Sequence, residues 1–226
     1  MRKLSIAIDG PAGAGKSSVA RMLASQLGYI YLDTGAMYRA ITYEALRRGL
    51  SEQQPAEVSK MAGQIRMKAE QGKQGMRIFL NGREVTPFLR TEAVSTHVSG
   101  IAAIPRVREV LVAMQRALAA GGGVVLDGRD IGTVVLPKAD VKVFLTASAE
   151  ERAKRRFREM KGGTEKMSLS AIEANIRRRD RVDAERQVSP LRAAEDAVLI
   201  DNSSMTLEET AEAIAGLCRR AQGASL

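Results

Sequence analysis

Short apolar runs alternate with helix-like segments along most of this chain. The runs lie at residues 4–8, 29–32, 124–127, 141–145 and 197–201, and each is short enough for a buried strand. The segments with helical spacing of apolar residues lie at 16–27, 34–49, 105–118, 149–160 and 170–181, and a last one begins near residue 206. Strands that alternate with helices are typical of an α/β fold, so we expect a parallel β-sheet core flanked by helices.

The alternation is lost between residue 50 and about residue 100. Residues 76–80, the pair Asn81-Gly82 and residues 83–85 predict a β-hairpin, because Asn-Gly suits a type I′ turn. We expect a small antiparallel insertion here, on the substrate side of the fold. The single domain 1–226 would then comprise a core (about 1–38, 104–150 and 190–226), this insertion (about 39–103) and a lid region (about 151–189).

The lid is predicted from two arginine-rich helices that flank the stretch Lys161-Gly162-Gly163-Thr164. Basic helices around a glycine hinge are typical of a mobile element that closes over phosphates. The alternative for the individual arginines is an ordinary charged face in contact with solvent.

A glycine-rich motif follows the first predicted strand and opens the first predicted helix. It consists of Gly10, Pro11, Ala12, Gly13, Ala14, Gly15, Lys16 and Ser17, and it fits the P-loop pattern G-x-x-x-x-G-K-[ST] at every fixed position. Glycines let backbone N–H groups turn inward around a phosphate, and the helix N-terminus adds its positive dipole. Lys16 can reach the β- and γ-phosphates, and the Ser17 hydroxyl can ligate Mg²⁺. The motif predicts a site for a nucleoside triphosphate with Mg²⁺; the alternative is a plain glycine-rich turn before a helix.

A second candidate element lies at the end of the strand predicted at 124–127. Asp127 would stand at the carboxyl end of a parallel strand, which is where α/β proteins bind ligands, and Arg129 follows at once. Arg39 falls in the early turns of the helix after Asp33-Thr34, where it could point at an anion. Alternatively, Asp127 is only a turn residue, and Arg39 is only a solvated residue on the surface.

The chain carries a large net positive charge, which points to anionic partners. Its 35 basic and 26 acidic residues give a formal net charge of +9. Nucleic acid is one candidate partner, and a site that collects cations around phosphorylated small molecules is another. Aromatic residues make up only 4% and Trp is absent, which argues against stacking platforms for single strands.

Other features of the sequence bear on where in the cell the protein is located. No apolar run approaches the roughly 20 residues of a membrane span, and the N-terminus runs directly into the first strand without room for a signal peptide. The one cysteine, Cys218, suits a reducing cytosol and core packing, and the one histidine, His97, suits a structural role. We therefore expect a cytoplasmic protein that does not bind membranes.

The P-loop alone is compatible with several classes of protein. A signalling GTPase usually carries Asn-Lys-x-Asp, which this chain lacks, and an ATPase motor usually needs a longer chain. A kinase of small phosphorylated acceptors needs a donor loop, an acceptor clamp and a lid that excludes water, and all three have candidates. The acceptor could be CMP, UMP, AMP or shikimate. A basic nucleic-acid-binding ATPase is the alternative from another class.

Specific motifs then resemble those of the bacterial-type cytidylate kinases. They are residues 32–39 (LDTGAMYR), residues 127–133 (DGRDIGT), and Arg179-Asp180 followed by Asp183, Arg186 and Ser189-Pro190-Leu191. The resemblance runs from about Ile6 to the last helix. It implies the nucleoside monophosphate kinase form of the P-loop NTPase fold, and transfer of the γ-phosphate from ATP, with Mg²⁺, to CMP or dCMP to give CDP or dCDP. It also implies no nucleic-acid partner, and we expect a monomer.

The resemblance further implies roles for individual residues. Ser99, Arg108 and Asp130 would address cytosine, Arg39, Arg129 and Arg186 the acceptor phosphate, and Arg179 and Asp183 the ribose and phosphate, with Thr34 also in the CMP site. Ser18 would join residues 10–17 in the donor site, although many relatives have Thr there. Arginines among Arg152 to Arg158 would close on the donor phosphates. We assign catalytic roles to Lys16, Asp127, Arg129 and Arg155.

Cytosine recognition by these residues has a physical reason. A carboxylate such as Asp130 can accept a hydrogen bond from N4, and Arg108 can donate to N3 or O2. Uracil reverses the polarity at both N3 and C4 and would leave buried polar groups unpaired, at roughly 1–3 kcal/mol each. Loss of the ribose 2′-hydroxyl need not strand a partner. The sequence therefore predicts that CMP and dCMP are used and UMP poorly.

Overall fold

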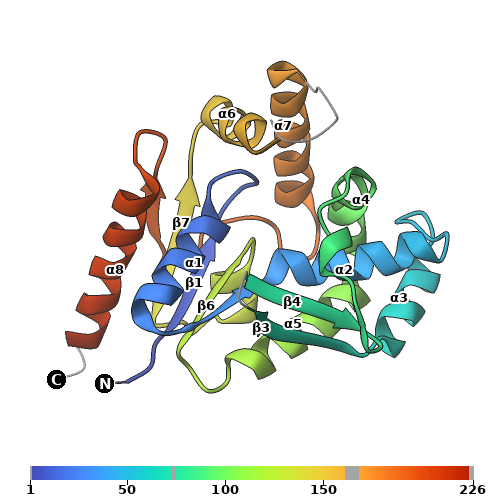
Figure 1. Cartoon of the computed structure of the whole chain (residues 1–226), viewed down its shortest axis with the longest axis horizontal. Coiled ribbons are helices and arrows are strands. Elements are labelled where there is room, and N and C mark those ends of the chain that lie inside the picture. Colours follow the sequence, from blue (N-terminus) through green and yellow to red (C-terminus); the bar gives the residue numbers. More distant parts are fainter. Residues whose placement is uncertain (1, 73–74, 161–167, 224–226) are drawn as a thin grey trace.

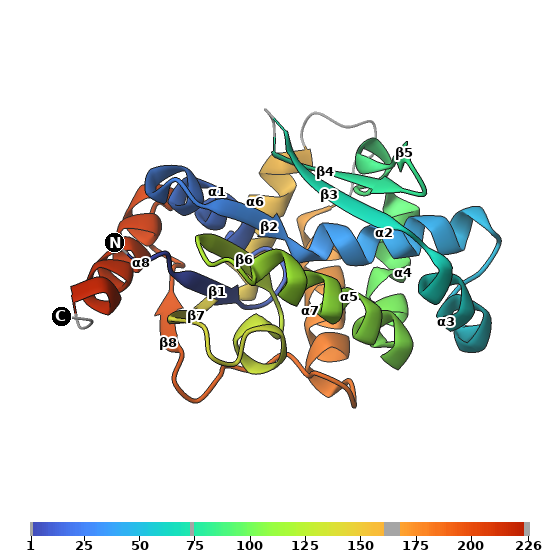
Figure 2. The same cartoon turned by 90° about the horizontal axis from the view of Figure 1, so that it is seen from below.

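The computed structural model describes residues 2–72, 75–160 and 168–223 and is built around a five-stranded parallel sheet. The strand order is β2-β6-β1-β7-β8. Figure 1 shows the whole chain, and Figure 2 labels all five strands of this sheet. The strands are β1 (Ser5–Asp9), β2 (Ile30–Asp33), β6 (Val124–Gly128), β7 (Val141–Thr146) and β8 (Val198–Asp201). The predicted parallel core is confirmed, with strand limits within one residue of those expected.

Helices cover both faces of this sheet. The described part of the chain has the helices α1 (Lys16–Leu27), α2 (Thr34–Arg47), α3 (Pro55–Gln64), α4 (Glu92–Ala103), α5 (Pro105–Ala119), α6 (Ala149–Met160), α7 (Leu169–Glu185) and α8 (Leu207–Gly223). Of these, α3 and α4 pack against α2 and α5. Within β1, Ile6 and Ile8 pack with α1 and α8, whereas Ala7 packs with the cluster that α2 and α5 join. Cys218 is 1% exposed in the first of these clusters, which confirms its role in core packing.

A second, antiparallel sheet forms where the alternation was lost. It consists of β3 (Met67–Gly72), β4 (Gly75–Leu80) and β5 (Arg83–Glu84), in that order. Asn81 and Gly82 join β4 to β5 with φ values of +49° and +85°, so the predicted hairpin is confirmed. The sheet lies within the proposed insertion 39–103, beside α2 (Figure 2).

Helix ends follow the capping chemistry of the sequence. The Asp33 carboxylate accepts a hydrogen bond from the Ala36 N–H at 2.8 Å and begins α2. Before α8, Thr206 and Glu209 form a reciprocal capping box, with bonds of 2.8 and 3.1 Å. His97 on α4 contacts Glu52 through Nδ1 at 2.8 Å, which fits a structural role.

The helices α6 and α7 pack against each other over one end of the sheet (Figure 1). Ala153, Ile172 and Ile176 form a small core of their own between these helices. The glycine hinge expected at 161–164, and the rest of the stretch to Met167, lie outside the described residues. The division into core, insertion and lid therefore remains a proposal. Among the described residues, no helix is both long and apolar enough to span a membrane.

Three neighbouring strands place polar residues at one edge of the sheet. The pairing sets Ile8 of β1 and Asp33 of β2 opposite Asp127 of β6. Since the strands are parallel, the residues that follow β1, β2 and β6 all leave the sheet on the same side. The P-loop, the start of α2 and the turn at Arg129 thus converge there.

Candidate active site

The P-loop lies tightly against the neighbouring strand and α6. Gly10 has φ +147°, and a Cβ at this position would lie 1.9 Å from the Leu145 carbonyl oxygen. Gly13 has φ +79°, and a Cβ there would lie 3.1 Å from the Cβ of Arg152. At Gly10 and Gly13, therefore, the close approach of the protein's own chain already requires glycine.

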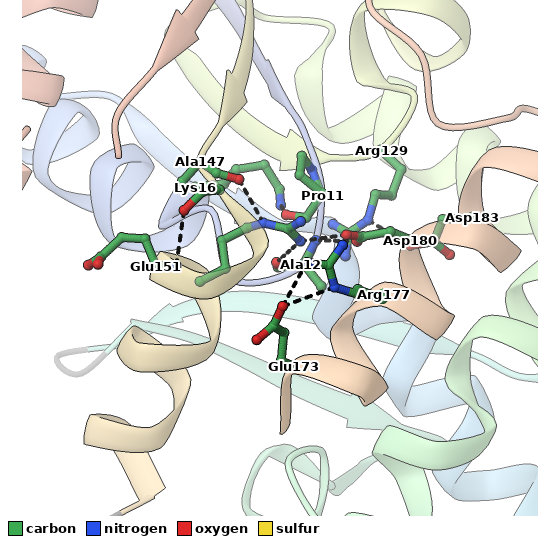
Figure 3. Close-up of polar contacts among 12 residues, drawn as sticks. Pro11, Ala12, Lys16, Arg129, Ala147, Glu151, Glu173, Arg177, Asp180 and Asp183 are labelled. Carbon is green, nitrogen blue, oxygen red and sulfur yellow. Dashed lines mark hydrogen bonds and ion pairs between the residues drawn. The ribbon is translucent and has the colours of Figure 1, made fainter. Parts of the chain in front are cut away.

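Lys16 begins α1 and is almost fully buried, with 6% of its surface exposed. Its Nζ donates a hydrogen bond to the Pro11 carbonyl at 2.7 Å, across the P-loop (Figure 3). Burial lowers the pKa of Lys16 well below its usual value, and the nearby Arg129 lowers it further. An anion beside this ammonium group would restore the charged form.

The Ser17 hydroxyl and the Asp127 carboxylate lie side by side. Ser17 Oγ donates to Asp127 Oδ2 at 2.8 Å, and the Tyr31 hydroxyl donates to Oδ1 at 2.8 Å. Thr34 Oγ1 donates to the Asp127 carbonyl at 2.6 Å and so joins α2 to β6. Burial, followed by the nearby Asp33, raises the pKa of Asp127 to about 6. Asp127 stands near the carboxyl end of the parallel strand β6, as expected, and contacts the P-loop through Ser17.

One cavity of about 1210 Å³ connects the P-loop with α2, α4, α6, α7 and the turn after β6. Among the described residues that line it, eleven are Lys or Arg and six are Asp or Glu. More than half of the net charge of +9 is thus concentrated in one concave site. The predicted site residues that line the cavity are Ala12, Gly13, Gly15, Lys16, Ser17, Ser18, Thr34, Arg39, Ser99, Arg108, Asp127, Arg129, Asp130, Arg155, Arg179, Asp183 and Arg186. Gly10, Pro11 and Ala14 belong to the same loop but do not line the cavity.

A buried charged cluster brings Arg108 and Asp130, which were expected at the base, together with Arg186, which was expected at the acceptor phosphate. Arg108 Nη2 donates to Asp130 Oδ2, and Arg186 Nη2 lies 3.8 Å from Asp130 Oδ1. The three side chains are only 3–6% exposed. Arg108 also lies over the ring of Tyr38, 5.2 Å from its centroid. Ser99 of α4 lines the same cavity.

Four more predicted site residues line the cavity: Arg39 and Arg129, expected at the acceptor phosphate, and Arg179 and Asp183, expected at the ribose and phosphate. Arg129 Nε donates to Asp183 Oδ2 at 2.9 Å, which joins the turn after β6 to α7. Arg39 donates to Ser95 Oγ at 2.9 Å. Burial, and then the neighbouring Arg179, lowers the pKa of Arg39 to about 9. Arg179 also has a lowered pKa, because it is buried and close to Arg129.

The predicted lid arginines differ in what they contact. Arg155 lies at the P-loop, where its guanidinium donates to the side-chain and backbone oxygens of Asn202 at 3.1 and 2.7 Å. Arg152 is buried, and its guanidinium donates to Ala147, Ala12 and Asp180. Arg152 therefore supports the P-loop through the Ala12 carbonyl, and the closing of lid arginines on donor phosphates stays a prediction.

Sequence reasoning missed several residues that hold the site together. Asp9 is 4% exposed, and its carboxylate accepts hydrogen bonds from the N–H groups of Ile131 and Gly132 at 2.8 and 2.7 Å. Burial raises the pKa of Asp9 to about 6. Asn202 donates to the Ala14 carbonyl at 3.1 Å. Both residues stand at or just after the end of a parallel strand, so the rule that pointed to Asp127 could have found them.

Comparison with known proteins gives a consistent result. The family model described as Cytidylate kinase matches residues 6–220. A cytidylate kinase of Geobacillus thermodenitrificans (strain NG80-2) is 51% identical over 94% of this chain and 95% of that protein. One from Desulfitobacterium hafniense (strain Y51) is 50% identical over 96% of this chain and 93% of that protein. A solved structure of an uncharacterized protein from Eubacterium ventriosum ATCC 27560 is similar in fold, with a TM-score of 0.50 and 12% identity over 95% of this chain and 97% of that one. By its match to the family model and these relatives, the chain belongs to the cytidylate kinase family.

Proposed function

We propose that this nucleoside monophosphate kinase transfers the γ-phosphoryl group of ATP to CMP and dCMP within the cavity beside the P-loop. The main support is a set of buried polar atoms that lack a hydrogen-bond partner within the described part of the chain. Four of the residues that carry such atoms line the cavity: Tyr38, Arg108, Arg179 and Arg186. Buried donors without partners are costly, so their convergence indicates a ligand rich in acceptors.

The reaction requires little covalent help from the protein. An oxygen of the acceptor phosphate bonds to the γ-phosphorus while the bond from that phosphorus to the β–γ bridging oxygen breaks, and ADP leaves. The attacking oxygen is already ionised, so no general base is needed. Lys16 and Arg129 supply positive charge, and their burial strengthens its effect on the charge that develops during transfer.

We propose that Ser17 and Asp127 hold Mg²⁺ together with phosphate oxygens and water. The donor set fits, because Ser17 Oγ and Asp127 Oδ2 are adjacent oxygen ligands only 2.8 Å apart. Mg²⁺ is usually bound by one or two protein groups plus substrate phosphates. When bound, it would neutralise charge on the transferring phosphates. Asp127 stays anchored by Tyr31, whose hydroxyl donates to the other carboxylate oxygen.

We propose that Asp130 and Arg108 recognise cytosine. The Asp130 carboxylate would accept from N4, and Arg108, which has an unpaired Nε, would donate to N3 or O2. Because the two side chains already pair with each other, they are oriented before the nucleotide binds. Uracil would present a carbonyl oxygen to the Asp130 carboxylate, which is unfavourable.

The proposal that dCMP is accepted rests on Asp183. This carboxylate, assigned to the ribose, already accepts from Arg129 at 2.9 Å. Absence of the 2′-hydroxyl would therefore not leave it unpaired. We expect kcat/KM for dCMP to lie within about tenfold of that for CMP.

We also propose a cytoplasmic monomer that does not bind nucleic acid. Basic side chains gather inside the cavity, where they would be occupied by nucleotides. The large exposed apolar side chains lie on several elements, for example Ile30, Phe88 and Leu118, and only Val198 and Leu199 of those in the described residues are neighbours in one strand. The one cysteine is a buried thiol.

A substrate panel tests this function. ADP formation would be measured with ATP, Mg²⁺ and either CMP, dCMP, UMP, AMP or shikimate, with EDTA as the control for the metal. We expect turnover with CMP and dCMP far above the others, and none after chelation. Preference for UMP or AMP would contradict the base recognition. ATP hydrolysis stimulated by polynucleotide and steeply weakened by salt would favour the nucleic-acid ATPase instead.

A further inference from the structure

Two lid helices hold both polar groups of one P-loop residue, Ala12. The Ala12 N–H donates to Asp180 Oδ1 of α7 at 3.3 Å, and Arg152 Nη1 of α6 donates to the Ala12 carbonyl at 2.9 Å. The same Arg152 nitrogen lies 2.5 Å from Asp180 Oδ2. Figure 3 shows Ala12 and Asp180 meeting where α6 and α7 approach the P-loop. Ala12, Arg152 and Asp180 thus form a closed group, which we call the Ala12 link.

The Ala12 link is held in place by burial and by further contacts. The Arg152 side chain is only 8% exposed, and its Nε donates to the Ala147 carbonyl at 2.9 Å, which fixes its direction. The Asp180 side chain is 22% exposed. Gly13, the next residue of the P-loop, packs against Arg152 so closely that a Cβ would lie 3.1 Å from the Arg152 Cβ. Asp180 thus uses one carboxylate oxygen for the Ala12 N–H and the other for Arg152, and a partly buried carboxylate with two separate partners resists rearrangement more than a surface ion pair does.

The Ala12 link controls the direction of a phosphate-binding group. In a trans peptide, the C=O of one residue and the N–H of the next point in opposite directions. Arg152 holds the Ala12 carbonyl outward, toward α6, so the Gly13 N–H points the other way. Gly13 lines the cavity. The position of Arg152, and of Asp180 that pairs with it, therefore decides how well this N–H can meet a donor phosphate.

The helix that carries Asp180 also carries residues assigned to the acceptor. Arg179 precedes Asp180, and Asp183 follows it by three residues, which places Asp183 one turn further along a neighbouring face. Asp183 accepts from Arg129 at 2.9 Å, and both lie at the acceptor part of the cavity. One rigid helix thus contacts the acceptor site through Arg179 and Asp183 and the donor loop through Asp180.

We propose that Asp180, held by Arg152, is a positioning residue that couples the two nucleotide sites energetically. Binding of CMP fixes α7 through Arg179 and Asp183, and α7 fixes the Ala12 peptide through Asp180. The P-loop then binds the donor more tightly, and by reciprocity the donor strengthens binding of CMP. This inference rests on the proposed acceptor site.

The coupling is measured by calorimetric titration of the magnesium complex of β,γ-imido-ATP, without and with saturating CMP. In the unsubstituted protein we expect CMP to lower the Kd of this analogue at least fivefold. In Asp180→Ala we expect a change of less than twofold, while the Kd of CMP alone stays within about threefold. A merely structural role would weaken both ligands without changing this ratio. Glu173→Gln is the matched control, because Glu173 lies on the same helix and pairs with Arg177, and its carboxylate makes no hydrogen bond to residues 10–17 of the P-loop.

Asp180→Asn provides a second, isosteric variant should Asp180→Ala fail to fold. Its amide oxygen can still accept from the Ala12 N–H, but it loses the charge that holds Arg152, so we expect coupling between those of the other two proteins. Equal coupling in the unsubstituted protein and either variant would overturn the inference, as would no coupling at all. These results differ from failure of the proposed function, in which the unsubstituted protein would neither bind nor phosphorylate CMP.

Discussion

Asp130→Asn is the substitution that tests the buried charged cluster most directly. It removes the only negative charge from a group in which Arg108 and Arg186 are 3% and 6% exposed. Removal of one partner from a buried ion pair costs about 3–5 kcal/mol. The amide keeps one acceptor for Arg108, so we expect the lower end, about 3 kcal/mol. For a chain of this size that corresponds to a fall in Tm of about 6–12 °C.

The same substitution should change base preference. Two mispaired groups at roughly 1–3 kcal/mol each predict that the unsubstituted protein favours CMP over UMP in kcat/KM by roughly 30- to 20,000-fold. The amide can donate to O4 of uracil, which removes one of the two mismatches. We therefore expect the CMP-to-UMP ratio to fall by roughly 5- to 150-fold in Asp130→Asn, measured as ADP formed at limiting acceptor concentration.

The matched control is Asp196→Asn. Asp196 pairs with Lys142 at 2.8 Å outside the cavity and is 67% exposed, so the same chemical change should leave the CMP-to-UMP ratio unaltered. An unchanged ratio in Asp130→Asn, in a protein that remains folded by circular dichroism, would refute the assignment of Asp130 to the base. A change of similar size in Asp196→Asn would show that the ratio reports something other than direct recognition.

Three further predictions concern charge and metal. Arg129→Ala should lower kcat roughly 10³-fold with little change in Tm, because other arginines still neutralise its carboxylate partner; near-normal turnover would contradict its role as a phosphate clamp. Ser17→Ala should raise the Mg²⁺ concentration at half-maximal activity about tenfold in a Mg²⁺ titration, whereas Ser59→Ala on α3 should not; equal values would remove Ser17 from the metal site. Glu44→Gln should lower the Tm by about 1–3 °C at pH 7, since the hydrogen bond from Arg47 lowers the pKa of Glu44. The lowered pKa of Glu44 stabilises the folded state above the unfolded-state pKa, and this stability is lost as the pH falls through the folded-state pKa. The difference in Tm should therefore shrink as the pH falls below about 4.5, and a difference that does not shrink there would contradict this.

The parallel core and the convergence at its edge could be predicted from the sequence because they depend on local pattern. A P-loop after an apolar run, and Asp127 at the end of another, are enough to place Ser17 and Asp127 at the same edge once the sheet is parallel. The hairpin at Asn81-Gly82 is equally local, since the turn demands positive φ at both residues.

Other elements depend on tertiary contacts that no short pattern encodes. The strand β3 reads Met-Lys-Ala-Glu-Gln-Gly, a run with few strand-forming residues, and it forms by pairing with β4. Helices α3 and α4 were not predicted, because their apolar positions pack against α2 and α5 rather than the sheet. The contacts of Arg152 and Asp180 with Ala12 could not be predicted either. On a basic helix, the sequence does not tell an arginine that supports the P-loop from one that binds phosphate, nor which arginine a given carboxylate pairs with.

The most direct test of the account is a crystal structure of the protein with CMP and ADP bound. We expect cytosine N4 to lie about 3 Å from the Asp130 carboxylate, and the CMP phosphate to contact Arg129. A base bound beside residues 202–207, or an Asp130 carboxylate beyond hydrogen-bond distance of the base, would contradict the proposed recognition of cytosine.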